Sequence, residues 1–333
     1  MRRLRFAILS FAHVHAWSYA RVLRSLEEAE LVAIYDDDPE RLRRAAELYG
    51  VRDAYTDYRQ LLRRDDVDAV VIASENAKHA ELAVAAAEAG KHMIVEKPLA
   101  TTLEDAERMI RAAERAGVKL QQAFVMRYHD ATVEVKRMLE AGAVGRVLAI
   151  TTTNHGKFPG LWFDDPKLAG GGAVMDHTVH TADLMRWYTG DEVEEVYAVI
   201  GRNIRPHLRS EDCALISLRF RGGVLGSIDC SWSRHEGWPI WGDVFLAVYG
   251  TEGFIAVDAF RPCINLVTDE GRRFTWHYFG PDADFNMIRD FVHAVLEDRP
   301  PRATGYDGYK ALEVALAAYE SAKAGSPVKL PLR

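Results

Sequence analysis

Short apolar runs alternate with amphipathic segments over the first 125 residues of the chain. Strands buried on both faces are predicted by continuous apolar runs at residues 4–9, 31–35, 67–73, 92–95 and 118–125. Helices are predicted by helical apolar spacing in the segments that begin at His15, Pro39, Ala77 and Leu103. Strands that alternate with helices in this way predict a parallel, doubly wound sheet of the α/β class.

The pattern changes after residue 125. Helices are predicted near 130–141 and 175–188, and strands then follow one another at 211–220, 224–232, 244–249, 254–258 and 263–268. Two helices near 284–297 and 307–324 close the chain. We therefore predict two domains, 1–125 and 126–333. The second is of the α+β class with a mostly antiparallel sheet, and the last helix is expected to pack back on the first domain.

Composition narrows the class of protein. The chain has 48% hydrophobic and 27% charged residues, and no apolar run approaches the roughly 20 residues of a membrane span. Its formal net charge of −7 argues against sequence-independent binding to nucleic acid. Cys213, Cys230 and Cys263 show no metal-ligand spacing, so free thiols are expected. These features favour a cytoplasmic enzyme over membrane, fibrous or secreted disulfide-rich proteins.

The first strand–helix turn is where a doubly wound sheet binds a dinucleotide, normally through G-x-G-x-x-G. Here small residues, Ser10 and Ala12, stand at the first two glycine positions, and His15 stands at the third, with His13 between them. Taken alone, this turn is a failed dinucleotide fingerprint. It nevertheless has the position of a phosphate loop, so these four residues are candidates for cofactor contact.

A carboxylate at the end of the second strand strengthens the dinucleotide interpretation. Asp36 lies about 25 residues beyond the turn, where a carboxylate can accept hydrogen bonds from ribose hydroxyls. The alternative is that residues 36–38 only cap the next helix, a role that Asp38 is expected to have. Because a carboxylate at Asp36 would repel a 2′-phosphate, NAD is favoured over NADP.

Polar residues also follow two later strands. Ser74, Glu75 and Asn76 come after one strand, and Glu96-Lys97-Pro98 comes after the next. A parallel sheet brings these strand ends to one edge, where ligands bind. A lone lysine at a strand end is usually a solvated surface residue, but the proline fixes the direction in which the chain leaves the strand. A positioned Lys97 is therefore a candidate catalytic group.

The segment after Gly170-Gly171-Gly172 combines a glycine run with a helix rich in polar residues. Asp176 and His180 are four residues apart and share one helical face, with Asp183 next along it. A histidine can take a hydroxyl proton at neutral pH, and a nearby carboxylate orients it and raises its basicity. This pattern favours alcohol oxidation over the alternative of histidines that serve only the core.

Other candidates have weaker signals. Asp176, His177 and His180 could together ligate a metal, but adjacent residues point about 100° apart on a helix, so no metal is expected. His155, Lys157, Trp162 and Phe163 are predicted to lie in a Gly/Pro-containing loop before the glycine run. Substrate contacts are assigned to His155, Lys157, Trp162 and His177.

The chain resembles the Gfo/Idh/MocA oxidoreductase family, which includes glucose–fructose oxidoreductase and inositol dehydrogenase. The matching features are, in order along the chain, Asp36, the segment 74–79, Glu96-Lys97-Pro98, the Asp176-x-x-x-His180-x-x-Asp183 helix and the segment 307–325. The resemblance implies an N-terminal Rossmann domain that binds NAD(P) and a C-terminal domain with a large open sheet. It also implies a homodimer or homotetramer that forms through that sheet.

The resemblance assigns roles to individual residues. Lys97 would bind and polarise the reacting oxygen, His180 would be the general acid/base, and Asp176 would orient them while hydride passes to or from nicotinamide C4. Typical substrates of the family are sugars, inositols and related polyols. Cofactor contacts are implied at the phosphate loop, at Asp36 and at the strand ends: Ser74, Glu75, Asn76, His79, Glu96 and Lys97.

This sequence departs from the family pattern at three places. The phosphate loop lacks all three glycines, Ser74-Glu75 replaces the usual Thr-Pro, and Thr178 stands where the family often has glycine. These departures bear on cofactor affinity and substrate identity more than on the fold. Two alternatives to a dehydrogenase therefore stay open: a glycosidase or lyase that uses tightly bound NAD for transient oxidation, and a non-catalytic nucleotide-responsive protein. Loops 155–166 and 232–241 are expected to select the substrate.

Overall fold

The chain divides into two units, each with its own sheet. The computed structural model describes residues 3–261, 263–268, 273–278, 280 and 282–332. The first unit consists of residues 1–128 and 282–309, and the second of residues 129–281 and 310–333. The first unit therefore recruits a segment from near the end of the chain in addition to its N-terminal part.

The first unit is built on a six-stranded parallel sheet in the order β3-β2-β1-β4-β5-β6. Its strands are β1 (Leu4–Leu9), β2 (Ala29–Tyr35), β3 (Ala54–Tyr55), β4 (Ala69–Ile72), β5 (His92–Val95) and β6 (Leu120–Gln122). All four residues of β4 are buried, as the continuous apolar run predicts. The predicted doubly wound parallel sheet is confirmed, and its strand order reverses between β1 and β4.

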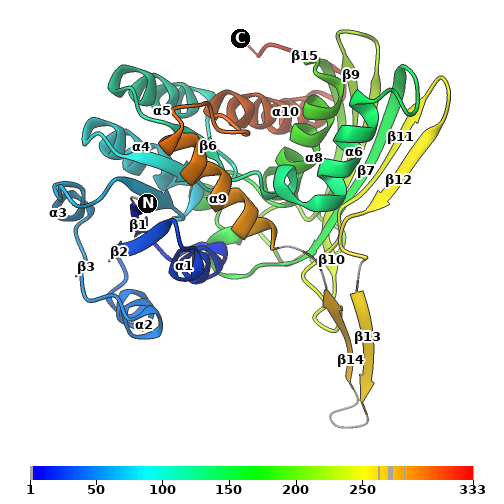
Figure 1. Ribbon diagram of the computed structural model, residues 1–333. Coiled ribbons are helices and arrows are strands. Elements are labelled where there is room, and N and C mark those ends of the chain that lie inside the picture. Colours follow the sequence, from blue (N-terminus) through cyan, green and yellow to red (C-terminus); the bar gives the residue numbers. More distant parts are fainter. Residues whose placement is uncertain (1–2, 262, 269–272, 279, 281, 333) are drawn as a thin grey trace. The chain divides into compact units, whose positions relative to one another are not determined.

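Helices cover both faces of this sheet (Figure 1). They are α1 (His15–Ser25), α2 (Pro39–Tyr49), α3 (Tyr58–Leu62), α4 (His79–Glu88), α5 (Leu103–Ala116) and α9 (Ala283–Leu296), with short 3₁₀ turns η1 (Asn76–Lys78) and η2 (Val125–Tyr128). Asp38 caps α2 and Thr102 caps α5 by accepting hydrogen bonds from backbone N–H groups. Helix α9 packs its buried Ile288 and Phe291 into the same core as α1, which places the penultimate helix in the first unit.

The second unit contains a mixed seven-stranded sheet in the order β12-β11-β7-β10-β9-β8-β15. Its strands are β7 (Val147–Lys157), β8 (Val193–Gly201), β9 (Cys213–Phe220), β10 (Leu225–Arg234), β11 (Phe245–Gly250), β12 (Phe254–Asp258) and β15 (Val328–Lys329). Strands β7 and β10 pair in parallel and the other pairs are antiparallel. Strands β13 (Cys263–Thr268) and β14 (Arg273–Tyr278) form a separate hairpin.

Strand β7 is absent from the elements that the apolar pattern predicts. After Ile150 its residues are Thr, Asn, His, Gly and Lys, so no apolar periodicity marks it. Threonine is β-branched and favours strands, and the alternate residues Ile150, Thr152 and Asn154 are buried. The predicted loop at residues 155–157 is therefore wrong: His155 and Lys157 belong to a central strand.

Helices cover one face of the second sheet and leave the other uncovered (Figure 1). They are α6 (Asp130–Glu140), α7 (Pro166–Ala169), α8 (Ala173–Thr189) and most of α10 (Gly305–Ala324), with the 3₁₀ turn η3 (Leu161–Asp164). Helix α8 packs on β10 and β7. Because the sheet is covered on one side only, its outward-facing residues, among them Leu215 and Phe254, are exposed apolar side chains.

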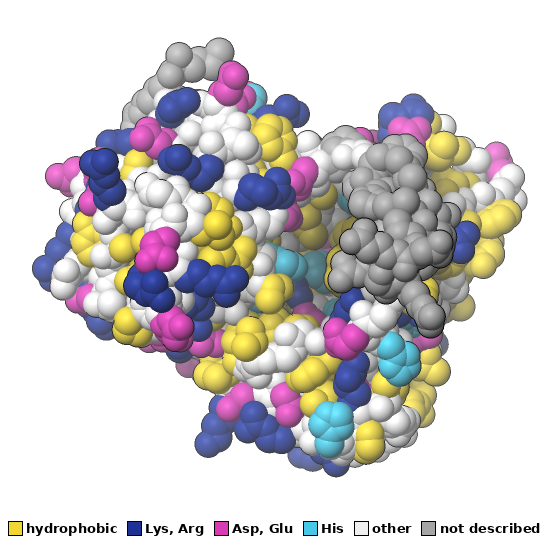
Figure 2. Space-filling model, turned by 90° about the horizontal axis from the view of Figure 1, so that it is seen from below, with side chains coloured by type: hydrophobic (Ala, Val, Ile, Leu, Met, Phe, Trp, Pro, Cys, Tyr) yellow, Lys and Arg dark blue, Asp and Glu magenta, His cyan; other side chains and the backbone are white. Residues whose placement is uncertain are grey.

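The surface carries charges of both signs. Lys and Arg side chains are interspersed with Asp and Glu on the face seen in Figure 2, in keeping with 42 basic and 49 acidic residues in the chain. Within the described residues, every helix is too short or too polar to span a membrane.

Candidate active site

The turn between β1 and α1 keeps the backbone shape of a glycine-rich loop without the glycines. Ser10 has a φ of +78°, a left-handed conformation that normally favours glycine. Its Oγ accepts a hydrogen bond from the N–H of Ala12 at 3.1 Å. The N–H of Phe11, which lies between these two residues, donates to Asp36 Oδ2 at 2.7 Å. Side-chain acceptors thus hold the strained turn in place.

Asp36 lies at the predicted strand end, but its oxygens bind the protein itself. The side chain is fully buried and pairs with Arg41 through two contacts, Nε–Oδ2 at 2.8 Å and Nη2–Oδ1 at 2.6 Å. Oδ1 also accepts from the N–H of Asp38 at 2.8 Å. Burial raises the pKa of Asp36, although Arg41 and the N–H donors act in the opposite direction. Asp36 therefore fixes the turn, and its contact with a ribose stays a prediction.

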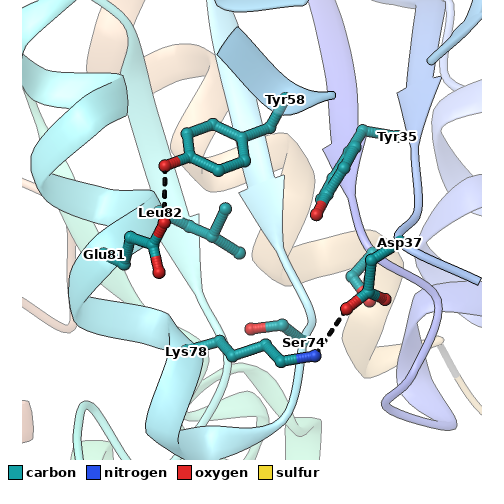
Figure 3. Close-up of a pocket in the computed structure, with 8 residues that line it drawn as sticks. Tyr35, Asp37, Tyr58, Ser74, Lys78, Glu81 and Leu82 are labelled. Atoms are coloured by element: carbon teal, nitrogen blue, oxygen red, sulfur yellow. Dashed lines mark hydrogen bonds and ion pairs between the residues drawn. The ribbon is translucent and has the colours of Figure 1, made fainter. Parts of the chain in front are cut away.

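A cavity of about 150 Å³ opens at the carboxyl ends of β1, β2 and β4, where the strand order reverses (Figure 3). It is lined by Ser10, Tyr35, Asp37, Tyr58, Ser74, Lys78, Glu81 and Leu82. This is the place where an open α/β sheet binds its ligand. The Tyr35 and Tyr58 rings line one part of it, and Tyr58 donates to Glu81 Oε1 at 2.7 Å.

Of the two carboxylates at the end of β2, Asp37 lines this cavity and Asp36 does not. Lys78 Nζ lies 2.6 Å from Asp37 Oδ2 and 3.0 Å from Glu75 Oε2. Burial alone would raise the pKa of Asp37, but Lys78, together with Asp36 and Arg41, outweighs it and the pKa is lowered. The cavity therefore presents a paired carboxylate and ammonium group. Neither residue stands out in the sequence.

Glu96, the residue after β5, is the centre of a buried polar cluster. Its Oε1 accepts from Tyr19 at 2.5 Å and lies 3.0 Å from His15 Nδ1, and its Oε2 accepts from the N–H of Lys97 at 2.9 Å. Burial by itself opposes ionisation, but His13, His15 and Lys97 outweigh it and hold the pKa of Glu96 well below its usual range. For His15, burial is likewise outweighed by Glu96, and the pKa is raised.

Lys97 is almost entirely buried and precedes a cis peptide to Pro98. His79, the first residue of α4, connects this strand end to the neighbouring one. Its Nδ1 lies 2.9 Å from the Pro98 carbonyl and its Nε2 lies 3.3 Å from the Ser74 carbonyl. Burial lowers the pKa of His79. The first unit thus brings together at one sheet edge the predicted residues Ser74, His79, Glu96 and Lys97.

In the second unit, α8 carries Asp176, His177, His180 and Asp183, all buried. Trp232 on β10 donates from Nε1 to Asp176 Oδ2 at 2.9 Å. His177 Nε2 lies 3.2 Å from the same oxygen, and its Nδ1 lies 2.8 Å from the Asn154 carbonyl on β7. Asp176 is therefore oriented by an indole and an imidazole. Nothing in the sequence signalled the contact with Trp232.

The glycine run before α8 admits a carboxylate and a phenol to the helix N-terminus. Glu211 Oε1 accepts from the N–H groups of Gly172 at 2.8 Å and Val174 at 3.1 Å, and from the Tyr319 hydroxyl at 2.7 Å. Tyr319 in turn accepts from the N–H of Met175 at 3.2 Å. Burial raises the pKa of Glu211. These bonds satisfy N–H groups that the first turn of a helix leaves unpaired.

The predicted substrate residues lie in different environments. His155 faces away from α8, on the uncovered face of the sheet, where Nε2 lies 3.1 Å from Asp229 and Nδ1 lies 3.4 Å from Asp243. Lys157 donates to the Glu236 carbonyl at 2.9 Å. Trp162 is buried and stacks on Phe163 with ring centroids 4.0 Å apart. Of the four substrate candidates, His177 is the one on α8 beside Asp176.

Comparison with known families covers most of the chain. Residues 9–124 match a family described as "Oxidoreductase family, NAD-binding Rossmann fold". Residues 132–256 match the "GFO/IDH/MocA C-terminal domain".

Individual relatives match over nearly the whole length. The chain is 34% identical over 323 residues to a myo-inositol 2-dehydrogenase of Thermotoga maritima, with 94% of each chain covered. It is 31% identical over 333 residues to a D-apiose dehydrogenase of Paraburkholderia graminis, covering 96% of this chain and 86% of the relative. A levoglucosan dehydrogenase solved with NADH and L-sorbose superposes with a TM-score of 0.85 at 27% identity, with 100% of both chains covered.

The Glu211 backbone approaches Gly172 closely at the start of α8, and this contact predicts the effect of adding a methyl group at Gly172. A Cβ at Gly172 would lie 2.0 Å from the Glu211 carbonyl oxygen, a backbone atom that cannot move aside cheaply. We expect Gly172→Ala to lower the free energy of unfolding by about 1–3 kcal/mol in urea denaturation. Gly237→Ala is the control, because a Cβ there has nothing within 4 Å. Equal stability of the two variants would contradict the packing described.

Proposed function

The chain belongs to the GFO/IDH/MocA oxidoreductase family, and we propose that it is an NAD-dependent dehydrogenase of an inositol, a sugar or a related polyol. The names of its relatives support this substrate class. The observation that carries the proposal is α8, on which a buried Asp176 is oriented by Trp232 four residues before a buried His180. A buried carboxylate and imidazole at this spacing suit general acid/base chemistry on a hydroxyl group.

The residues of the first unit fit a dinucleotide. The left-handed Ser10 reproduces the first glycine of a phosphate loop, and the cavity beside it has a carboxylate, Asp37, at the end of β2. Ser74 lines the same cavity from the end of β4. Ser10, Ala12, His13, His15, Asp36, Glu75, Asn76, His79 and Glu96 stay predicted cofactor contacts.

In the proposed mechanism, bound NAD would supply the hydride acceptor for oxidation of the substrate and the hydride donor for its reduction. The Lys97 ammonium group binds the reacting oxygen and stabilises the negative charge that develops on it. The His180 imidazole takes the hydroxyl proton during oxidation and gives it back during reduction. Asp176 orients the reacting groups, and Trp232 keeps its carboxylate in one orientation. The buried positions of Lys97 and His180 limit competition from water.

We propose that NAD is preferred to NADP because of Asp37 together with Asp36. Asp37 lines the cavity and pairs with Lys78, which also lines it. Asp37 therefore repels a 2′-phosphate and neutralises a cation that could bind one. Arg41 is a second cation close by, held by Asp36 and 3.1 Å from Asp37. Two carboxylates thus mask two cations that could otherwise bind a phosphate.

We further propose that the protein forms a homo-oligomer through the uncovered face of the second sheet. Strands β8 to β12 each place an exposed apolar side chain on this face: Tyr197, Val199, Leu215, Leu225, Phe245, Tyr249 and Phe254. Exposed apolar side chains gathered on one face of a sheet favour an interaction surface. Most oligomers of soluble proteins are homo-oligomers, in which one such face meets another copy of itself.

The catalytic assignment predicts a loss of turnover without a loss of cofactor binding. A panel of polyols and sugars, followed by NADH absorbance with NADP in parallel, first identifies a substrate. We then expect Lys97→Ala and His180→Ala each to lower kcat by at least ~100-fold and to leave NAD affinity within a few-fold. The controls are Lys119→Ala and His293→Ala, which alter a lysine and a histidine that are both partly exposed and lie in surface ion pairs.

Near-normal turnover in either active-site variant would refute the role of that residue. NAD that stays bound through purification without net turnover would favour the glycosidase or lyase alternative, and failure to bind NAD would overturn the proposal as a whole.

The cofactor assignment predicts a change in preference. Asp37→Ser removes the charge that opposes a 2′-phosphate and releases Lys78, so we expect the ratio of kcat/KM for NADP to that for NAD to rise about tenfold, or about 1.4 kcal/mol. Asp66→Ser, which removes a carboxylate paired with Arg64 instead, serves as the control. An unchanged ratio would show that Asp37 does not set the preference.

The assembly surface predicts a change in oligomeric state. We expect Leu215→Asp to shift the protein to the monomer at micromolar concentration in light scattering, because it buries a charge in an apolar interface. Leu48→Asp is a matched control, since Leu48 on α2 and Leu215 are both 63% exposed. A variant that assembles like the parent would place the interface elsewhere.

A further inference from the structure

His13, His15 and Glu96 form a cluster with the composition and spacing of a metal site. Each offers one ligand atom, and these three atoms all lie within 4.8 Å of one another. Glu96 Oε1 is 3.0 Å from His15 Nδ1 and 3.8 Å from His13 Nδ1. The three residues come from the β1–α1 turn, the first position of α1 and the end of β5.

The distances suit a tetrahedral ion. Zinc binds imidazole nitrogen and carboxylate oxygen at about 2.0–2.2 Å, which places neighbouring ligand atoms about 3.3 Å apart. The two separations from Glu96 Oε1 lie on either side of that value, and all three ligand atoms lie within 4.8 Å of one another, so side-chain rotations would bring them to it. His13 and Glu96 are buried, whereas the side chain of His15 is 38% exposed. The cluster is thus enclosed by the protein and has one side from which an ion can enter.

The surrounding hydrogen bonds orient the ligand atoms. The N–H of His15 donates to His13 Nδ1 at 3.2 Å, so this nitrogen presents a lone pair, which an ion would take in place of the N–H. Tyr19 holds Glu96 Oε1, and the N–H of Lys97 holds Oε2. Partners that orient a ligating carboxylate in this way are typical of metal sites.

We propose that His13, His15 and Glu96 bind one divalent transition-metal ion of the zinc class. Two imidazoles and a carboxylate are a ligand set for zinc and its neighbours, whereas magnesium and calcium require oxygen ligands. Three protein ligands leave a fourth position for water. The ion displaces the proton shared between His15 and Glu96 and replaces the hydrogen bond from the His15 N–H. It joins the glycine-free turn to the end of β5, next to Lys97.

The test measures metal binding, and its outcome does not depend on the dehydrogenase assignment. The full-length protein is treated with a chelator, dialysed and titrated with Zn²⁺ by calorimetry and with Co²⁺ by visible absorption. We expect one equivalent to bind with a micromolar or lower Kd, with the intense absorption of tetrahedral cobalt. His15→Ala and Glu96→Gln should each weaken binding at least about tenfold. Using two variants keeps the test valid if one of them fails to fold.

The control is a histidine–glutamate cluster elsewhere in the first unit. The side chain of His293 on α9 is 43% exposed, with Nδ1 3.2 Å from Glu297 and Nε2 3.8 Å from Glu28, so it has similar ligands but none of them is buried. His293→Ala should leave the affinity unchanged. Absence of binding at 100-fold excess of metal, or equal binding by the parent and both site variants, would overturn the inference. A protein that oxidises polyols with NAD but binds no metal would overturn this inference alone.

Discussion

Glu96 is a carboxylate buried at the end of a parallel strand, and a buried charge must be compensated wherever it stands. The first unit meets this requirement with a phenol and a histidine from α1, a histidine of the preceding turn and the N–H of Lys97. These partners draw the β1–α1 turn toward the end of β5. The same ionised group therefore fixes the shape of a loop without glycines and the starting point of the proposed catalytic lysine.

The second unit also compensates a buried carboxylate, in this case at the end of a helix. Glu211 is buried at the N-terminus of α8, where unpaired N–H groups and the positive end of the helix dipole stabilise a carboxylate. Gly171 and Gly172 allow Tyr319 and the Glu211 backbone to approach closely, and Trp232 holds Asp176 one turn further on. Because α8 is buried on nearly all sides, its polar residues are positioned by partners on other elements, as acid/base chemistry requires.

Sequence reasoning predicted the first unit well because its strands are continuous apolar runs and its helices have clear caps, such as Asp38 and Thr102. It predicted the second unit less well because β7 consists mainly of threonine and other polar residues. Sequence alone also did not distinguish Asp36 from Asp37 as the residue that lines the cavity. Successive side chains at the end of β2 point in different directions, so Asp36 is buried beside Arg41 while Asp37 lines the cavity.

The sequence by itself determined the fold class, the family and the short motifs around Lys97 and His180, since these depend on local periodicity and on residues close together in the chain. Only the tertiary structure decided which side chains meet. Glu211 and Tyr319 are separated from the glycine run by about 40 and 150 residues in the chain, and His155 lies on the sheet face opposite α8. Contacts of this kind follow from strand register and sheet order, which no local pattern encodes. For the same reason, the enclosed cluster of His13, His15 and Glu96 depends on the sheet order, which places β5 in the same sheet as β1, beside β4.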